Sequence, residues 1–155
     1  MLHETPGSTP QQLELTTDLP GVEPDVVLRY FTDADLVKEW WAPESEIDLD
    51  GATYTHRWPE TGLTVGGRIL EHRPGELLAF SWESEHELNE PERTVVVSVA
   101  PHEGGTRLTI RHGEYGPTDG EAEEREGHLD GWEHYLPQLA EALGVGEPGP
   151  DLPGT

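Results

Sequence analysis

The stretch LRYFTDADLVKEWWAP (Leu28 to Pro43) places two adjacent tryptophans at the end of a short helical pattern. Thr32 and Asp35 have the spacing of a capping box, which predicts that a helix begins there. Residues four apart share one side of a helix, so Trp40 and Trp41 end two rows about 100° apart around the axis. The two indoles therefore face different neighbours, and the proline that follows ends the element.

The residues before this stretch predict one strand and one short helix. In QLELTTDL, Leu13 and Leu15 alternate with polar residues, which is typical of a strand. VEPDVVLRYF follows, with Pro24 at a first helical position and with Val27 and Phe31 four residues apart. Two short helices therefore follow the first strand.

The residues after the stretch change to a period of two between Ile47 and Arg111, which predicts strands. The alternating segments are ATYTHRW, LTVGGRILEH, ELLAFSW, RTVVVSVA and TRLTIRH. Clusters of Gly, Pro and Glu separate them, as turns do, so an antiparallel meander is the simplest arrangement. The acidic insert from Glu83 to Glu92 is expected to be a longer hairpin loop.

A long helix is predicted from about Thr118 to Leu143, with Thr118 and Glu121 spaced as a capping box. Gly127 and Gly131 lie four apart on one face; they fit close packing against a sheet, although their missing side chains also leave room for a ligand. Pro137 is expected to kink the helix because it removes an internal hydrogen bond. The apolar stripe consists of Leu129, Trp132, Leu136, Leu139, Ala140 and Leu143.

Composition limits the classes of function. The chain has 32 Asp and Glu against nine Lys and Arg, a formal net charge of -23, which repels nucleic acids and anionic membranes. It has no cysteine, and it has no signal peptide or apolar run that would span a membrane. We therefore expect a soluble, cytoplasmic protein without a nucleic-acid partner.

Four segments carry a resemblance to a known family: LRYFTDADLVKEWWAP, GGRILEHRPGELLAFSW, VVVSVAPHEGGTRLTIRHGEY and EGHLDGWEHYLPQLAEAL. Together they resemble the heat-shock protein 90 ATPase activator homologue family of the START-like (SRPBCC) superfamily. The resemblance implies an α+β helix-grip fold, in which a curved antiparallel sheet wraps around the long C-terminal helix. We expect one such domain over residues 11–143, with loose tails at residues 1–10 and 144–155.

The resemblance also implies an apolar cavity between the sheet and the long helix. Relatives use such a cavity for binding lipids or polyketides, for cyclase-type chemistry or for partner contact. In this setting one of the two adjacent tryptophans packs in the core and the other faces the cavity, and we expect Trp40 to be the core residue. Aromatic and polar residues on the inward faces are the candidate ligand-binding set: Trp41, Tyr54, His56, Trp58, Phe80, Trp82, His112, His128, Trp132 and Tyr135.

Any one of these aromatic residues is more often plain core than a ligand contact, and each histidine is more often a hydrogen-bonded interior residue. A cavity is favoured by the polar side chains on the same inward faces: His56 lies between Tyr54 and Trp58, and His112 follows two inward apolar residues. Zinc-protease, nucleophile-elbow and phosphate-loop motifs are absent, so no catalytic residue, metal or cofactor is predicted.

Three functions remain from the sequence. The leading hypothesis is a non-enzymatic protein, a monomer or homodimer, that binds a hydrophobic or amphipathic small molecule in its cavity. An enzyme with cyclase- or hydrolase-like activity in the same cavity would use His56 or His112 as acid or base. A chaperone-associated or regulatory protein with a filled cavity would act through a protein partner instead.

Overall fold

The computed structural model describes residues 3–4, 9–84 and 93–145. Its strands are β1 (His3–Glu4), β2 (Gln12–Leu19), β3 (Glu44–Asp48), β4 (Thr53–Trp58), β5 (Leu63–Arg73), β6 (Leu77–Ser84), β7 (Arg93–His102) and β8 (Gly105–Gly113). Its helices are α1 (Pro24–Thr32), α2 (Ala34–Val37) and α3 (Asp119–Ala142).

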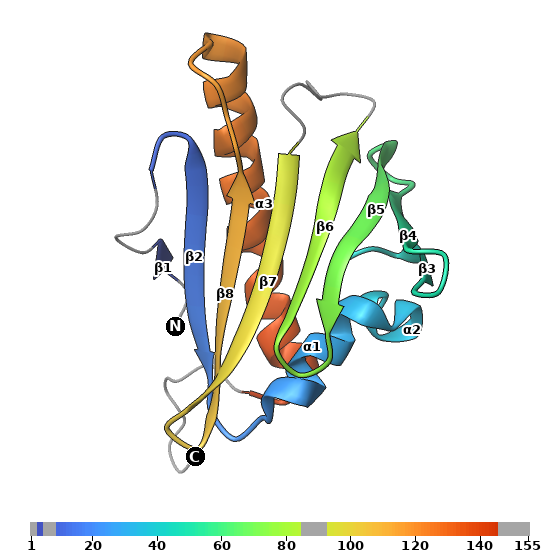
Figure 1. Ribbon diagram of the computed structural model, residues 1–155, viewed down its shortest axis with the longest axis vertical. Helices are drawn as coiled ribbons and strands as arrows, with labels where there is room; N and C mark the ends of the chain where they lie inside the picture. Colours follow the sequence, from blue (N-terminus) through green and yellow to red (C-terminus); the bar gives the residue numbers. More distant parts are fainter. Residues whose placement is uncertain (1–2, 5–8, 85–92, 146–155) are drawn as a thin grey trace.

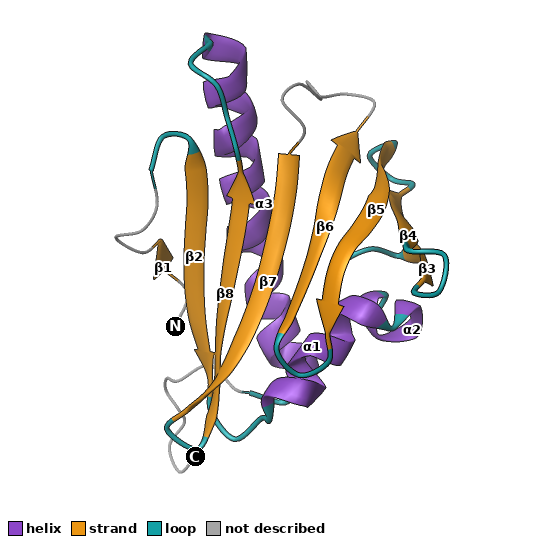
Figure 2. Cartoon of the chain, in the orientation of Figure 1, coloured by secondary structure: helices purple, strands orange, loops and turns teal. Residues whose placement is uncertain are grey.

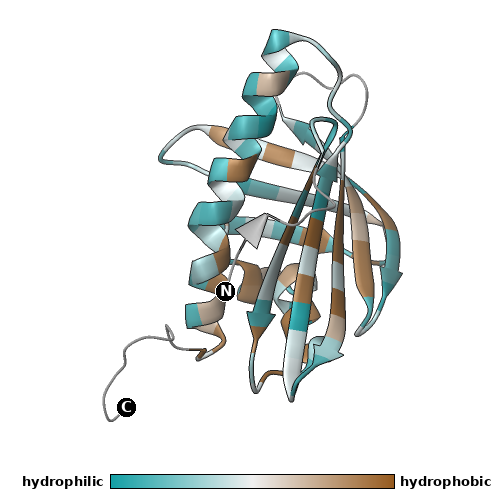
Figure 3. Cartoon of the chain, turned by 90° about the vertical axis from the view of Figure 1, so that its left-hand side faces the viewer, coloured by the Kyte–Doolittle hydropathy of each residue, from teal (hydrophilic) through white to brown (hydrophobic). Residues whose placement is uncertain are grey.

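The eight strands form one antiparallel sheet in the order β1-β2-β8-β7-β6-β5-β4-β3. From β3 to β8 each strand pairs with the next in the chain, which confirms the predicted meander, and β2 joins it beside β8. The sheet curves, and the long helix α3 runs along one of its faces (Figures 1 and 3). The helix-grip fold expected from the sequence is therefore confirmed.

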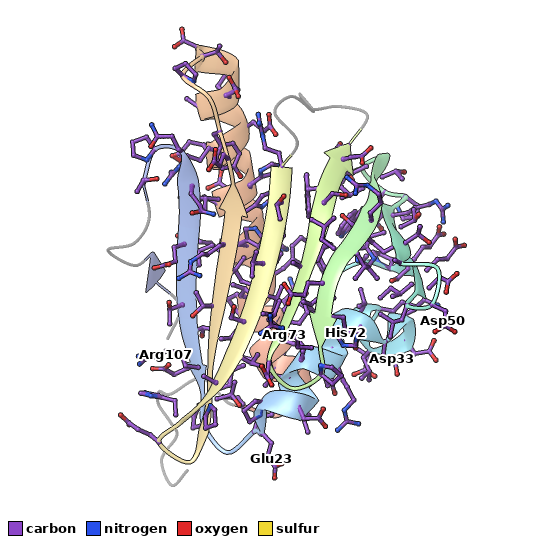
Figure 4. All side chains as sticks on the ribbon, in the orientation of Figure 1. Glu23, Asp33, Asp50, His72, Arg73 and Arg107 are labelled. Carbon is purple, nitrogen blue, oxygen red and sulfur yellow. The ribbon has the colours of Figure 1, made fainter. Side chains whose placement is uncertain are left out.

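Alternation of side chains decides which face of each strand is buried. On β4, Tyr54, His56 and Trp58 are buried, and on β8 His112 continues the buried row of apolar residues. Arg107 of β8 lies on the outward face (Figure 4). Its guanidinium pairs with the carboxylate of Asp18 on the neighbouring strand β2. The inward residues and α3 enclose the apolar core.

Two strands were not predicted. The segment ESEID of β3 carries a single apolar residue, Ile47, so alternation alone does not mark it, and it is held as an edge strand by pairing with β4. The two-residue strand β1 lies within the predicted N-terminal tail and pairs with Thr16 and Leu15 of β2. Both strands exist because a neighbouring strand offers free backbone groups.

The predicted capping box at Thr32 was wrong in position. The N-cap of α2 is Asp33, whose side chain accepts a hydrogen bond from the backbone N–H of Asp35 at 3.0 Å. Thr32 instead belongs to the last turn of α1, which begins with Pro24 as expected and lies beside the turn between β5 and β6 (Figure 2). The helix α2 is only four residues long, so Trp40 and Trp41 lie in the turn that follows it.

The second capping box is confirmed. Thr118 is the N-cap of α3, and its hydroxyl accepts from the backbone N–H of Glu121 at 3.1 Å. The helix then continues through Pro137. This residue lies on the exposed side, as does Glu133, so the carbonyl group that loses its donor is open to water.

Some sequence predictions lie outside the described residues. Of the predicted acidic loop, Glu83 and Ser84 belong to β6 and the remainder is not described. The same holds for residues 146–155 of the predicted C-terminal tail. In the part of the chain that is described, no helix has both the length and the hydropathy to cross a membrane.

Candidate functional site

A cavity of about 420 Å³ lies between α3 and the inward faces of β4, β5 and β6. Its volume falls within the range of small-molecule sites in proteins. The residues that line it are Trp41, Trp58, Thr61, Leu63, Trp82, Gly127, His128, Gly131, Trp132 and Tyr135. Six of the ten predicted ligand-binding residues are therefore among its walls.

Four tryptophans give the cavity its walls, and they contact one another. The ring of Trp41 stacks on Trp82 at a centroid distance of 6.3 Å and lies 5.3 Å from Trp132. Trp58 meets Trp41 edge to face at 6.0 Å, and its indole N–H donates to the backbone carbonyl of Trp41 at 2.8 Å. Fixed rings of this size supply broad apolar contact surfaces.

The two adjacent tryptophans have different roles. Trp40 packs edge to face on Phe31 at 5.0 Å and donates its indole N–H to the carbonyl oxygen of Tyr30. It is buried and does not line the cavity, whereas Trp41 does. Trp40 therefore lies in the core and Trp41 at the cavity wall, but the prediction that the two indoles face different neighbours was wrong. Their rings stack on each other at 5.2 Å and both contact Phe31, because the two residues lie in the turn after the short helix α2 and not within a helix.

Three predicted site residues lie elsewhere. Tyr54, His56 and Phe80 line a separate hollow of about 10 Å³, which has room for no more than about one water molecule. The hydroxyl of Tyr54 donates to the carbonyl oxygen of Ser81 at 2.6 Å, and Nδ1 of His56 lies 2.9 Å from the hydroxyl of Ser45. Both polar side chains are satisfied within the protein, as interior residues usually are.

Burial controls the protonation of these two side chains. It lowers the pKa of His56 to about 4, against an ordinary value of 6.5, and the imidazole is therefore neutral at neutral pH. Burial also raises the pKa of Tyr54 above its ordinary value, so the phenol keeps its proton. Both His56 and Tyr54 are therefore uncharged at neutral pH.

A histidine pair forms the polar end of the cavity. The rings of His112 and His128 are stacked at 4.2 Å with an interplanar angle of 12°. His128 lines the cavity, and its Nδ1 lies 2.7 Å from the hydroxyl of Tyr115. His112 lies behind it and is completely buried.

His112 has a fixed tautomer. The indole N–H of Trp132 donates to its Nδ1 at 3.0 Å, so the proton of a neutral imidazole is on Nε2. Nε2 is buried and has no hydrogen-bond partner among the described residues. Burial, then the neighbouring His128 and Arg93, hold the pKa of His112 well below its usual value. The ring is thus a neutral, buried donor that lacks an acceptor.

A buried ion cluster supports Tyr115 and the start of α3. The guanidinium of Arg93 is fully buried, contacts Glu121 at 3.2 Å and Glu124 at 3.0 Å, and lies 5.0 Å from the centre of the Tyr115 ring. It also donates to the carbonyl oxygen of Glu114 at 2.8 Å. These contacts join β7 to the first turns of the helix.

Charge and hydrogen bonding keep this cluster ionised. Burial alone would lower the pKa of Arg93, but the hydrogen bond and charge of Glu124, followed by those of Glu121, raise it. Hydrogen bonds from the backbone of Gly116 and from Thr118 lower the pKa of Glu121, with Arg93 adding to the effect. All the main partners therefore favour the charged forms.

Sequence reasoning missed several of these residues. Tyr115 follows β8 in an irregular segment, where no pattern indicates an inward position. Arg93 opens β7 on the same buried face as Val95, Val97 and Val99, so alternation was a signal for its inward position that the sequence reasoning did not use. Thr61 lies in the turn between β4 and β5, where alternation ends, and Leu63 is the first residue of β5. A Cβ built on Gly127 or Gly131 meets no atom within 4 Å, so the expected close packing at these glycines was wrong and the alternative, open space, is what the fold has.

A metal site finds no support in the described ranges 3–4, 9–84 and 93–145, which contain no group of three or more His, Cys, Asp or Glu arranged to hold an ion. The two histidines of the pair are stacked face to face rather than converging on one point. The chemistry available at the cavity is therefore apolar contact, ring stacking, and hydrogen bonding at its histidine end.

Comparison with known proteins agrees with the fold. The family described as Activator of Hsp90 ATPase homolog 1-like protein matches residues 22–144. No curated protein matches the sequence. Protein MLL2253 of Mesorhizobium loti is similar in structure, with a TM-score of 0.75 and 17% identity over 88% of this chain and 99% of that one.

Two further structures are similar. CalU16 of Micromonospora echinospora has a TM-score of 0.66 and 22% identity, covering 96% of this chain and 85% of its own. DynU16, a putative protein in the dynemicin biosynthetic locus, has a TM-score of 0.72 and 20% identity. The match covers 89% of this chain and 49% of DynU16. At these identities the likeness concerns the fold alone.

Proposed function

The chain belongs to the family of Activator of Hsp90 ATPase homolog 1-like proteins, and from this premise we propose that it binds a small, mostly apolar molecule in the cavity under α3. The observation that carries the proposal is the cavity itself, about 420 Å³ in volume and lined by four tryptophans with a histidine at one end. In a protein that binds no ligand, side chains that fill such a space would increase the stability, because an empty apolar cavity destabilises a protein.

The lining also indicates what the molecule is. Indole and phenol rings favour a ligand with a large apolar surface, and His128 offers one polar contact that fixes its orientation. The similar protein DynU16 belongs to a biosynthetic locus, which supports a small organic molecule as the ligand. Within this proposal the protein acts in the cytoplasm, where a chain without cysteine has no disulfide to lose.

An experiment with a neutral fluorescent probe tests the proposal. N-phenyl-1-naphthylamine is added to the protein, and its emission is followed while tryptophan is excited, because the cavity tryptophans transfer energy to a probe bound beside them. In parallel, the native mass of the purified protein is compared with its denatured mass. We expect one probe molecule per chain, or a bound molecule that already occupies the site and that denaturation releases.

A matched pair of variants on β5 locates the binding. Leu63 lines the cavity, whereas Leu70 of the same strand is 44% exposed and lies outside it. Leu63→Trp is expected to weaken probe binding at least about tenfold by occupying the cavity, and Leu70→Trp is expected to leave it unchanged. Equal binding in the two variants would exclude the cavity as the site, and an unmodified protein with neither probe binding nor excess mass would exclude the function.

Acid–base catalysis is a second candidate, favoured by the contact between Tyr115 and His128 at the cavity wall. A hydroxyl 2.7 Å from Nδ1 orients the imidazole, and the ring lines the cavity, where a histidine is the side-chain type best suited to proton transfer near neutral pH. If the protein is an enzyme, we expect it to convert the molecule that native mass analysis finds. We expect His128→Gln to lose this conversion while it still binds the molecule. Binding without conversion in the unmodified protein would leave only the binding function.

The open cavity weighs against the third hypothesis, a chaperone-associated or regulatory protein whose cavity is filled by aromatic residues.

A further inference from the structure

The face of α3 that lines the cavity carries two glycines among its five lining residues, which are Gly127, His128, Gly131, Trp132 and Tyr135. Residues one turn apart lie above one another on a helix, so the two glycines leave adjacent gaps between the large side chains. A Cβ placed on either glycine meets no atom within 4 Å. The gaps are therefore open space and form one continuous part of the cavity wall.

Packing elsewhere in the protein shows what a structurally required glycine looks like. A Cβ on Gly67 would lie 2.7 Å from the carbonyl oxygen of Ser81, and one on Gly105 would lie 2.6 Å from Cα of Pro20. No such constraint applies to Gly127 and Gly131, and both have helical geometry that alanine adopts more readily. The fold by itself thus gives no reason for either glycine.

The two glycines lie where the cavity meets solvent. Gly127 is exposed and Gly131 is partly exposed. On the facing side Thr61 of the β4–β5 turn is exposed, and Leu63 at the start of β5 is partly exposed. The opposite part of the wall, including His128, is buried. A molecule that enters between the turn and α3 passes over bare helix backbone before it reaches the tryptophans.

Resting on the proposed function, we infer that Gly127 and Gly131 select the ligand: they seat the broad face of a flat, uncharged ring system against the backbone of α3. Rings fit because the facing walls are indoles, which favour stacked or offset aromatic partners. A bulky branched molecule does not fit as well, because it is thicker than the space that the two absent side chains leave beside the helix backbone.

Charge of the ligand follows from the same wall. None of the ten lining residues is Asp, Glu, Lys or Arg, so a buried ion would have no ionised partner there. The net charge of -23 also repels anions from the entrance. At the inner end the polar side chain of the wall is His128, whereas His112 is completely buried behind it and does not line the cavity. A ring-bound carbonyl or hydroxyl group is the group that this end accommodates.

Substitution of the glycines tests the inference with N-phenyl-1-naphthylamine, which is flat and neutral. Gly131→Leu and Gly127→Leu are each expected to weaken its binding at least about tenfold, and Gly131→Ala about threefold, because side chains then occupy the ring site. Ala122→Leu is the matched control, since Ala122 is an exposed residue of the same helix outside the cavity. Its affinity is expected to equal that of the unmodified protein, and thermal midpoints verify that each variant is folded.

The anionic analogue 1-anilinonaphthalene-8-sulfonate tests the charge of the ligand with nearly the same rings. We expect it to bind at least about tenfold more weakly than the neutral probe at low salt, where charge repulsion is strongest. Equal or tighter binding of the anion would overturn the assignment of an uncharged ligand.

The possible failures are distinguishable. If Leu63→Trp loses the neutral probe while all three glycine variants bind it as the unmodified protein does, the role of the glycines is overturned and the binding function stands. If the unmodified protein binds neither probe and carries no molecule, the binding function and this inference fail together. Weakening in the glycine variants equal to that in Ala122→Leu would also overturn the inference, because it would not come from the cavity.

Discussion

The indole N–H of Trp132 on the long helix α3 donates to Nδ1 of His112 on β8, the last strand along the chain, over 3.0 Å. Indole is a donor only, so this contact requires that Nδ1 carry no proton and assigns the proton of the neutral ring to Nε2. The contact also connects the cavity wall to the buried histidine behind it. The tautomer of His112 thus depends on how α3 packs against β8.

The tautomer of His112 is a direct prediction. Nitrogen NMR of the imidazole at neutral pH is expected to show a protonated Nε2 and an unprotonated Nδ1. Trp132→Phe removes the donor, frees the tautomer and lowers the free energy of unfolding by about 1–3 kcal/mol through the unsatisfied Nδ1. Trp40→Phe is the control, because it also loses one indole hydrogen bond, to Tyr30, and should leave the His112 signals in place.

Acidification is expected to destabilise the protein before its carboxylates titrate. The pKa of His56 is lowered to about 4 in the folded protein, and that of His112 is also lowered. Below pH 6.5 these two histidines are therefore protonated in the unfolded chain while they stay neutral in the folded protein, and this difference favours unfolding. The stabilisation is complete above that pH and is lost as the pH falls. For His56 alone the loss amounts to about 3 kcal/mol by pH 4.

Urea unfolding between pH 7.5 and pH 5 measures this effect, since at these pH values ordinary carboxylates stay ionised. His56→Leu removes one of the two titrating groups and is expected to show a shallower fall in stability than the unmodified protein. An identical fall in the two proteins would mean that His56 titrates normally in the folded state.

Loss of Arg93 is expected to be among the most damaging single changes. Arg93→Met leaves Glu121 and Glu124 buried without their cation and should lower the free energy of unfolding by about 3–5 kcal/mol. Arg107→Met breaks a surface ion pair with Asp18 instead, and we expect a loss of no more than about 1 kcal/mol. Chemical denaturation compares the two variants.

A compensated variant separates lost charge balance from lost packing. If unpaired carboxylates cause the damage, adding Glu121→Gln and Glu124→Gln to Arg93→Met should recover part of the stability. No recovery would show that the contacts of Arg93 with Tyr115 and with the carbonyl group of Glu114 matter more.

Opposite effects are expected from two glycine-to-alanine changes. Gly131→Ala should raise the free energy of unfolding by about 0.5–1 kcal/mol, because alanine favours the helix and its methyl group enters open space. Gly67→Ala should lower it by about 1–3 kcal/mol, because the methyl group would meet the Ser81 backbone. A thermal or urea melt of each variant suffices, and a destabilised Gly131→Ala would mean that the space above this residue is occupied.

Periodicity of the sequence predicted most of the fold. Alternation in QLELTTDL and TRLTIRH gave β2 and β8 nearly to the residue, and the spacing of Thr118 and Glu121 located the start of α3. These features depend on local geometry, which a strand or a helix repeats every two or 3.6 residues. Where the local signal was weak or ambiguous, at β3 and at the Asp33 cap, the prediction missed the element or its first residue.

The candidate site could be predicted only in part for the same reason. Alternation correctly placed Trp58 and Trp82 on inward faces, but it gave Tyr54 and His56 the same status, and only the tertiary structure puts them in a separate hollow. Inward direction is a property of one strand. Sharing a cavity depends on how several elements approach one another.

By itself, then, the sequence determined the order of most of the elements, their buried faces and the aromatic character of the cavity walls. The tertiary structure decided three things that no local pattern contains: the stacking of His112 on His128, the ion pairs of Arg93 with Glu121 and Glu124, and the open space above Gly131. Each joins residues from different elements or depends on the distance between them. Such distances are fixed by packing of the whole core, because side chains there fill space collectively rather than one segment at a time.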